Sequence, residues 1–380
     1  MRGSITLFRI FGIDIKLHLS WWLVFVLISW SLATSFFPHY FPGQQNTIYW
    51  LMGIVSVLLL FVSVLLHELS HSLVARSRKI KVESITLFFF GGVAGINDED
   101  LKPSSEFLMA VAGPLFSLLL FAIFYGLYLI NGSSFWTPIT YYLYQMNLIL
   151  ALFNLIPGYP LDGGRAFRAL LFMHYKDIKK ATKIAVLGGR IFALLLALFG
   201  ILTVVNRQAS GLWFLFLGGF LYYIAGLSYE QVLVKDALGS IPVRTLLTKK
   251  FVKLDPSMRF SDFLQKYLDA DEEVFLVQNK SFSGMMDIKG LNPIPQRMQR
   301  LLNLKQVSIP LSTITPLQIN ETAFNAYQKF SAQNVDILPV MQKGVLLGFV
   351  ARRRVMHRLI WSLKYSIGVG KQNKKLLVEL

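Results

Sequence analysis

The sequence predicts a polytopic α-helical membrane protein that ends in a smaller α/β region. Of its 380 residues, 54% are hydrophobic and only 16% are charged, and the mean hydropathy is +0.51. A water-soluble domain carries about 25% charged residues, so much of this protein's surface does not face water. Apolar runs near the ~20 residues that cross a bilayer occur at roughly 18–37, 49–75, 105–130, 139–157, 185–205 and 211–234. We therefore expect six transmembrane helices.

The basic residues predict the orientation of these helices. Lys and Arg occur before the first apolar run, between the second and third, and between the fourth and fifth. The opposite connections, 38–48, 131–138 and 206–210, contain only Arg207. Because loops rich in Lys and Arg stay in the cytoplasm, we expect both termini there, in a protein of the cell (plasma) membrane. No small-residue cleavage site follows the first run, so we expect a retained helix rather than a signal peptide.

The net charge of +17 and the absence of cysteine narrow the choice of partners. The chain has 17 basic and 11 acidic residues up to residue 240, and 21 basic and 10 acidic residues after it. No helix-turn-helix, zinc-finger or aromatic-basic motif accompanies this charge, so we expect anionic membrane lipid, and no nucleic acid, as its partner. Without cysteine, a metal ion would need His, Asp or Glu ligands.

The second apolar run contains His67-Glu68-Leu69-Ser70-His71, an HExxH pattern. Residues four apart lie on one helix face, so both imidazoles can bind one divalent cation, and Glu68 lies about 100° around the helix, where it can reach water. This arrangement is typical of zinc-assisted hydrolysis. A hydrogen-bonded pair without function is the weaker explanation, because each ionisable group inside a bilayer costs at least ~2.5 kcal/mol. An ion-transport site is the remaining alternative.

A catalytic zinc ion needs a third protein ligand, and Asp162 is the best candidate. It lies in the segment 153–165, where prolines and glycines break the helix at the end of the fourth run. It is the only acidic residue between Glu106 and Asp177. His67 lies nine residues before Arg76 and Asp162 lies three before Arg165, so we expect both near the cytoplasmic face, at compatible depths. A helix cap or turn residue is the alternative role for Asp162.

These motifs resemble those of the site-2 protease family of intramembrane zinc metalloproteases. The resemblance covers roughly residues 1–235 and rests on three segments: HELSH, then Ala112-Gly113-Pro114 at the start of the next span, and then NLIPGYPLDGG. Ser70 departs from the family pattern, which usually has glycine there. Because this residue lies between the two histidines, we expect tighter packing and no loss of metal binding.

The resemblance also implies roles for individual residues. Its implied zinc ligands are His67, His71 and Asp162, and its implied general base is Glu68. It places Asn154 beside the site as a further catalytic residue, whose amide could hold the substrate or stabilise the oxyanion. An interhelical hydrogen bond is the alternative role for Asn154.

The segment Val82–Gly95 is too short and too rich in β-forming residues to cross a membrane. We expect a β-hairpin or re-entrant strand. The edge of such a strand can bind an unwound, extended substrate, as the family resemblance also implies. An aromatic hairpin that anchors the protein at the membrane surface is the alternative.

From Ile241 onward the sequence indicates a two-fold repeat. Ile241-Pro242-Val243 and Ile309-Pro310-Leu311 begin its halves, and in each half an amphipathic helix precedes a strand. The repeat resembles a tandem pair of CBS modules, which fold as β-α-β-β-α units and often bind an adenine nucleotide. Basic residues at 352–354 replace the ribose-binding pattern. We therefore favour a substrate-docking module, or one that forms a homodimer, over a nucleotide site.

The expected organisation is a transmembrane metalloprotease domain at 1–236, a tandem CBS-like regulatory domain at 237–363 and a basic, disordered tail at 364–380. The expected function is hydrolysis of a peptide bond in or next to a transmembrane segment of a membrane-associated protein substrate, near the cytoplasmic face, as in regulated intramembrane proteolysis. One alternative is a CBS-gated transporter or channel that uses the His/Asp cluster as an ion site. The spans lack the internal symmetry that transporters often have. Another alternative is an inactive scaffold, against which the complete His-Glu-His-Asp set argues.

Overall fold

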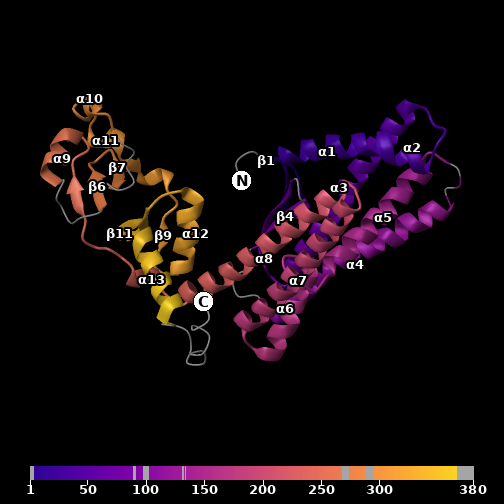
Figure 1. Cartoon of the computed structure of the whole chain (residues 1–380). Helices are drawn as coiled ribbons and strands as arrows, with labels where there is room; N and C mark the ends of the chain where they lie inside the picture. Colours follow the sequence, from indigo (N-terminus) through magenta and orange to yellow (C-terminus); the bar gives the residue numbers. More distant parts are fainter. Residues whose placement is uncertain are drawn as a thin grey trace. The chain divides into compact units, whose positions relative to one another are not determined.

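The computed structural model describes residues 4–88, 91–96, 102–130, 132, 134–267, 274–287 and 294–365. The chain divides into two compact units, Met1–Tyr229 and Glu230–Leu380, and the division falls within helix α8 (Figure 1). The predicted basic tail lies outside the described residues from position 366 onward.

Five helices in the described part of the chain are long and apolar enough to cross a membrane. The first, Ser20–Tyr40, consists of α1 (Ser20–Ser31), a π-helical turn (Leu32–Phe36) and α2 (Phe37–Tyr40). The other four are α3 (Asn46–Ser77), α4 (Pro103–Ile130), α7 (Ile178–Val205) and α8 (Gly211–Gly239). They match five of the six predicted spans.

The remaining predicted span, 139–157, forms helix α5 (Trp136–Asn154). This helix has 19 residues but is not among the five, because tyrosines, Gln145 and Asn147 make its first twelve residues more polar. Asn147 is fully buried, and its amide donates hydrogen bonds to Ser63 Oγ in α3 (3.3 Å) and to the Leu143 carbonyl (2.9 Å). The polar side of α5 therefore faces protein, and its crossing of the membrane stays a prediction.

A four-stranded sheet accompanies the helices of the first unit. It consists of two hairpins, β1 (Ser4–Ile10) with β2 (Ile13–His18) and β3 (Val82–Phe88) with β4 (Gly91–Ile96). Strands β2 and β3 pair in parallel, so the order is β1-β2-β3-β4 and β4 is an edge strand. The hairpin predicted in 82–95 is confirmed. The first hairpin was not predicted from the sequence.

One face of this sheet forms a core with the helices. Ile13 and Ile15 of β2 and Ile85 of β3 are buried together with Leu69 of α3 and Met109 of α4. The sheet therefore packs on the same part of α3 that contains the HExxH pattern.

A short, irregular segment connects α5 to helix α6 (Asp162–Tyr175). Its backbone packs against the start of α6, because a Cβ at Gly163 would lie 2.3 Å from the Leu155 oxygen and one at Gly164 would lie 2.3 Å from the Gly158 carbonyl carbon. The Tyr159 N–H also donates to the Ala185 carbonyl of α7 at 3.2 Å. These contacts fix the start of α6, and with it Asp162.

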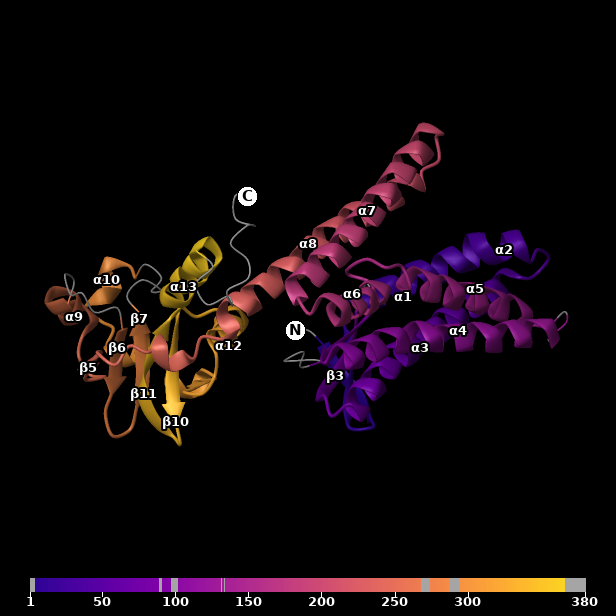
Figure 2. The ribbon, with the colours of Figure 1, turned by 90° about the horizontal axis from the view of Figure 1, so that it is seen from below.

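The helices of the first unit expose large apolar side chains. Trp22, Val26 and Trp30 of α1 are 53%, 58% and 55% exposed. Helices α7 and α8 lie side by side (Figure 2), and close packing of Gly200 against Gly211 holds them together while leucines on α7 face outward. In water such a surface would be unfavourable, whereas a bilayer covers it.

The second unit contains the predicted two-fold repeat. Its first half consists of β5 (Val252–Leu254), α9 (Phe260–Tyr267), β6 (Val274–Gln278) and β7 (Ser283–Asp287). Its second half consists of β9 (Leu317–Gln318), α12 (Ala323–Gln333), β10 (Ile337–Gln342) and β11 (Val345–Ala351), and α13 (Arg352–Tyr365) follows. Short elements connect the halves: α10 (Gln296–Gln299), α11 (Leu304–Val307), β8 (Ile309–Pro310) and a 3-10 turn (Leu311–Thr313), while another 3-10 turn (Val243–Thr245) precedes β5.

Both halves have the same strand pairing. The first strand is parallel to the second, and the third is antiparallel to the second. Alternate residues of β6 face two different cores, with Leu276 in one and Phe275 in the other. The repeat is therefore confirmed as two β-α-β-β units.

Candidate metal centre

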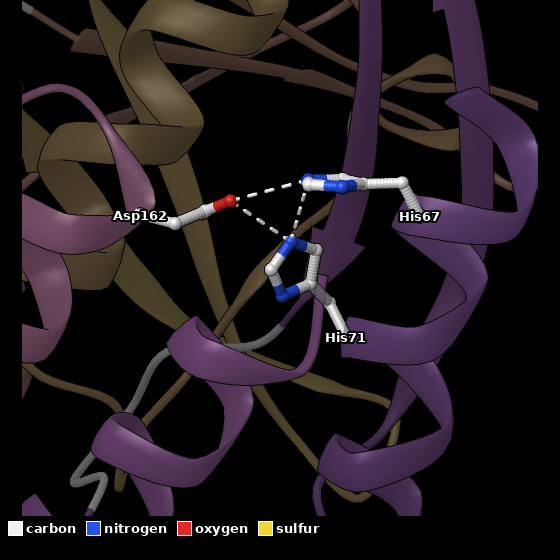
Figure 3. A group of neighbouring side chains, drawn as sticks. All are labelled: His67, His71 and Asp162. Carbon is white, nitrogen blue, oxygen red and sulfur yellow. Dashed lines mark hydrogen bonds and ion pairs between the residues drawn. The ribbon is translucent and has the colours of Figure 1, made fainter. Parts of the chain in front are cut away.

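Helix α3 places His67 and His71 one turn apart on a buried face, where they are 3% and 6% exposed. Their Nε2 atoms are 3.2 Å apart. Oδ2 of Asp162, the first residue of α6, lies 3.2 Å from His67 Nε2 and 3.1 Å from His71 Nε2 (Figure 3). The structure thus brings together the three residues predicted to bind a metal, although Asp162 is far from the histidines in sequence.

The hydrogen bonds of the imidazole rings orient their other nitrogens. His71 Nδ1 lies 2.6 Å from the Met109 carbonyl oxygen, which can only accept, so Nδ1 carries the proton and Nε2 of the neutral ring is an acceptor. His67 Nδ1 lies 2.8 Å from Ser117 Oγ. Two acceptors, His71 Nε2 and the Asp162 carboxylate oxygen, therefore face each other at 3.1 Å. They are stable at this distance when a cation lies between them.

The distances among these atoms fit a zinc ion. Zinc binds nitrogen at about 2.0–2.1 Å, so neighbouring ligand atoms of a tetrahedral site are about 3.3 Å apart. The observed separations are 3.1–3.2 Å. Two imidazoles and one carboxylate are also a typical catalytic zinc ligand set, which leaves the fourth position open for water or substrate.

Gly113 of α4 provides the space for both imidazoles. A Cβ atom at this position would lie 2.1 Å from His71 Nε2 and 2.6 Å from His67 Nε2. No side chain larger than hydrogen fits there. This glycine is the middle residue of the Ala-Gly-Pro motif, and the close approach of the two imidazoles explains why this position is glycine.

Glu68 lies where α3 meets the edge strand β4. A Cβ atom at Gly92 would lie 2.3 Å from Glu68 Cγ and 2.9 Å from its Cδ. The carboxyl group of Glu68 is therefore held beside the backbone of β4, next to the helix face that carries the two histidines.

The other two residues singled out in the sequence make hydrogen bonds within their own helices. The Asn154 amide, at the end of α5, donates to the Leu150 carbonyl at 3.0 Å, and its catalytic role stays a prediction. The Ser70 hydroxyl donates to the His67 carbonyl at 2.6 Å. This bond satisfies the hydroxyl on the helix itself.

Sequence analysis missed the groups that support the ligands. Ser117 is fully buried and polar in an apolar helix, which is a detectable signal of function. The Met109 carbonyl is a backbone group, so the residue type carries no signal for it. A buried ion pair between Glu106 of α4 and Arg168 of α6 was also missed.

The helical membrane fold and the buried His-His-Asp centre define the class of membrane-embedded metalloproteases. The family model described as Peptidase family M50 matches residues 55–141 and 130–198. A zinc metalloprotease of Methanocaldococcus jannaschii is 35% identical over 94% of this chain and 97% of its own length. Rip3 of Mycobacterium tuberculosis is 32% identical over 83% of this chain and 82% of its own length. The chain belongs to peptidase family M50, the site-2 protease family.

Among solved structures, a site-2 protease from Methanocaldococcus jannaschii is similar to this chain. It has 36% sequence identity and a TM-score of 0.43, and the match covers 60% of this chain and 95% of that chain. Family membership makes the protein an integral membrane protein and an intramembrane zinc metalloprotease that acts on a protein substrate. The transporter or channel alternative is not favoured.

Proposed function

We propose that His67, His71 and Asp162 hold the zinc ion and that Glu68 is the general base of peptide hydrolysis. The convergence of two imidazole nitrogens and one carboxylate oxygen within 3.2 Å carries this proposal. The His71 Nδ1–H bond to the Met109 carbonyl supports it, because it directs the lone pair of Nε2 to the same point.

Each residue then has a defined part in the reaction. A zinc ion bound by His67, His71 and Asp162 would supply Lewis acidity for the scissile carbonyl and for the attacking water. Glu68 accepts a proton from the attacking water, whose oxygen bonds to the carbonyl carbon. The same carboxyl group returns the proton to the amide nitrogen as the C–N bond breaks. Asn154 is proposed to hold the substrate or stabilise the oxyanion from the end of α5.

The substrate is proposed to bind along the edge strand β4. A helical substrate must unwind before water reaches its amide, and an edge strand offers hydrogen-bonding groups to an extended chain. The contact between Gly92 and Glu68 supports this proposal, because it puts the base directly beside that strand. We infer cleavage near the cytoplasmic face, as in regulated intramembrane proteolysis, from the basic residues that follow α3.

The test separates the base from the ligands. Glu68→Gln should reduce cleavage of a co-expressed membrane substrate by about 100- to 10,000-fold, the usual contribution of a general base. Its zinc content should equal that of the wild type, and the uncleaved substrate should co-purify with it. Asp162→Asn is the matched comparison, and it should lose zinc. Undiminished cleavage by Glu68→Gln, or normal zinc content in Asp162→Asn, would contradict the assignment.

We also propose six spans, with both termini in the cytoplasm and the protein in the cell membrane. The places where α4 contacts the metal centre support the crossing of α5. Met109 and Gly113 lie in the first half of α4 and Ser117 lies at its middle, and the helix then continues to Ile130. Because Asp162 returns to the histidines, α5 must run back alongside α4.

We infer that the second unit is a docking or dimerising module that does not recognise ribose. A cavity of about 470 Å³ at the start of α13 is lined by Arg353, Arg354 and Arg358 with His357, Thr245 and Leu246. Positive charge thus occupies the place where the resemblance would put an acidic ribose ligand, and it suits the headgroups of anionic lipids. Calorimetric titration of the full-length protein with ATP or AMP should show no stoichiometric heat. A clear binding signal would contradict this inference.

A further inference from the structure

Four residues of α4 form one stripe along the helix, and three of them contact the two histidines of the candidate metal centre. They are Glu106, Met109, Gly113 and Ser117, spaced three, four and four apart as on one helix face. Ser117 contacts His67, the Met109 carbonyl contacts His71, and Gly113 leaves room for both rings. Glu106 instead contacts Arg168, in the helix that begins with Asp162.

The ion pair of Glu106 and Arg168 is largely buried. Glu106 is 2% exposed, and the exposed fraction of the Arg168 side chain is 15%. A buried carboxylate without its partner is strongly unfavourable, so α6 must lie where the guanidinium group reaches α4. The N–H groups of a planar guanidinium point in fixed directions, so the ion pair restricts the orientation of the Arg168 side chain as well as its distance from Glu106.

Arg168 holds the chain on both sides of Asp162. Its guanidinium carbon lies 5.2 Å from the centre of the Tyr159 ring, in the segment just before α6. Arg168 itself lies six positions after Asp162. The Arg168 side chain therefore contacts both α4 and the segment before Asp162, while its backbone belongs to α6, the helix that begins at Asp162.

We propose that Glu106 and Arg168 are positioning residues that set Asp162 against the two histidines. The proposal rests on the proposed role of Asp162 as a zinc ligand. A productive ligand geometry must be held within about 0.5 Å, which requires a directional contact at the element that carries the ligand. The two histidines have such contacts in Ser117 and the Met109 carbonyl, and the Glu106–Arg168 pair does the same for Asp162.

Zinc affinity of the full-length protein tests the proposal, measured by competition with a chelator alongside the unfolding temperature of the zinc-free protein. Glu106→Gln and Arg168→Lys should bind zinc about 10- to 100-fold more weakly than the wild type. The double variant Glu106→Arg/Arg168→Glu restores the pair with reversed charges and should regain most of the affinity. A lower unfolding temperature alone would indicate only a structural role.

Arg190→Lys is the matched control. Arg190 of α7 also lies over a tyrosine ring, at 5.0 Å from Tyr222, and like Arg168 its Nε is buried without a hydrogen-bond partner among the described residues. It packs on α8 beside Gly226 and not on a helix that carries a ligand. Its replacement should leave zinc affinity unchanged.

The outcomes distinguish the two proposals. A wild-type protein that binds no zinc would refute the proposed metal centre itself. Wild-type affinity in Glu106→Gln and Arg168→Lys, or an equal loss in Arg190→Lys, would overturn the positioning role alone. If Glu106→Gln does not fold, Arg168→Lys decides, because it keeps a cation opposite the carboxylate while removing the guanidinium geometry.

Discussion

Gly113 lies in α4 at the point where both imidazole rings reach that helix. A Cβ atom added to this residue would lie 2.1 Å from His71 Nε2, which is far below any van der Waals contact. Because the two rings are already fixed through their Nδ1 atoms by Ser117 and Met109, they cannot retreat without breaking those bonds. The absence of a side chain at this residue therefore allows the two imidazoles to take the positions that the proposed metal centre requires.

Gly113→Ala should lower zinc affinity by at least about 100-fold, the upper end of what supporting groups contribute. Cleavage should fall with it, because the added methyl group occupies the place of the ligand nitrogens. Zinc content and cleavage of the purified variant measure both effects.

Gly126→Ala is the control for helix propensity. Gly126 lies in the same helix, and a Cβ there meets nothing within 4 Å. Its replacement should stabilise α4 slightly, by about 0.5–1 kcal/mol, and leave zinc binding unchanged. If both alanine variants bind zinc like the wild type, the rings do not approach α4 as described.

At the scale of elements, β4 contacts the proposed base and leaves the proposed metal ligands untouched. Gly92 touches Glu68, whereas Gly113 touches His67 and His71. The two glycines therefore control different steps, although both contacts involve the five-residue HExxH segment.

Gly92→Ala should reduce cleavage while zinc content stays at the wild-type level. The added Cβ would lie 2.3 Å from Glu68 Cγ, so the carboxyl group must move, and the histidines need not. We expect a decrease of about 10- to 1,000-fold, within the range of lost general-base catalysis. Zinc analysis and a cleavage assay on one preparation measure both quantities. Loss of zinc in this variant would mean that β4 supports the ligands themselves.

The elements that were predicted from sequence are those with local signals. The apolar runs predicted α3, α4, α7 and α8, and the β-rich segment after α3 predicted the β3–β4 hairpin. The pairing of β2 with β3 was not predictable, because it joins strands that are separated by α1, α2 and α3. Long-range parallel pairing leaves no local pattern in the sequence.

In the candidate site, too, local sequence patterns predicted some features, and long-range packing determined the others. His67 and His71 were predictable as a pair because helical periodicity alone places them on one face. Asp162 could be proposed as a ligand from its predicted depth in the membrane and from the broken helix around it. Its approach to the two histidines depends on how α6 packs against α4, which the sequence did not reveal. The contacts of Ser117 with His67 and of Glu106 with Arg168 depend on how three helices pack, which a sequence pattern does not specify.

At the scale of the whole molecule, the low charge content and the position of the metal centre belong together. Only 16% of the residues are charged, and the first unit covers its outside with apolar side chains. Two of its buried carboxylates have partners inside the protein: Asp162 faces two histidines, and Glu106 pairs with Arg168. A bilayer tolerates such groups only when each has a partner inside the protein.

The course of α4 and α5 predicts which loops face outward. Helix α4 has 28 residues and is about 42 Å long, and its first half contacts the metal centre. Its far end must then lie on the opposite side of the membrane from the start of α4. The 19 residues of α5 span about 28 Å, close to the thickness of a bilayer core of about 30 Å, and the segment 155–161 continues the chain to Asp162. We therefore expect residue 134 outside and the segment after α3 inside.

Single cysteines can test this topology, because the natural chain contains none. Ser134→Cys and Ser210→Cys, both at exposed positions, should react with a membrane-impermeant maleimide on intact cells. Ser77→Cys, at the end of α3, and Ser257→Cys in the second unit should react only after permeabilisation. Labelling of Ser134→Cys and Ser77→Cys from the same side would contradict the crossing of α4. External labelling of Ser257→Cys would contradict a cytoplasmic second unit, because an odd number of spans would then separate it from the loop after α3.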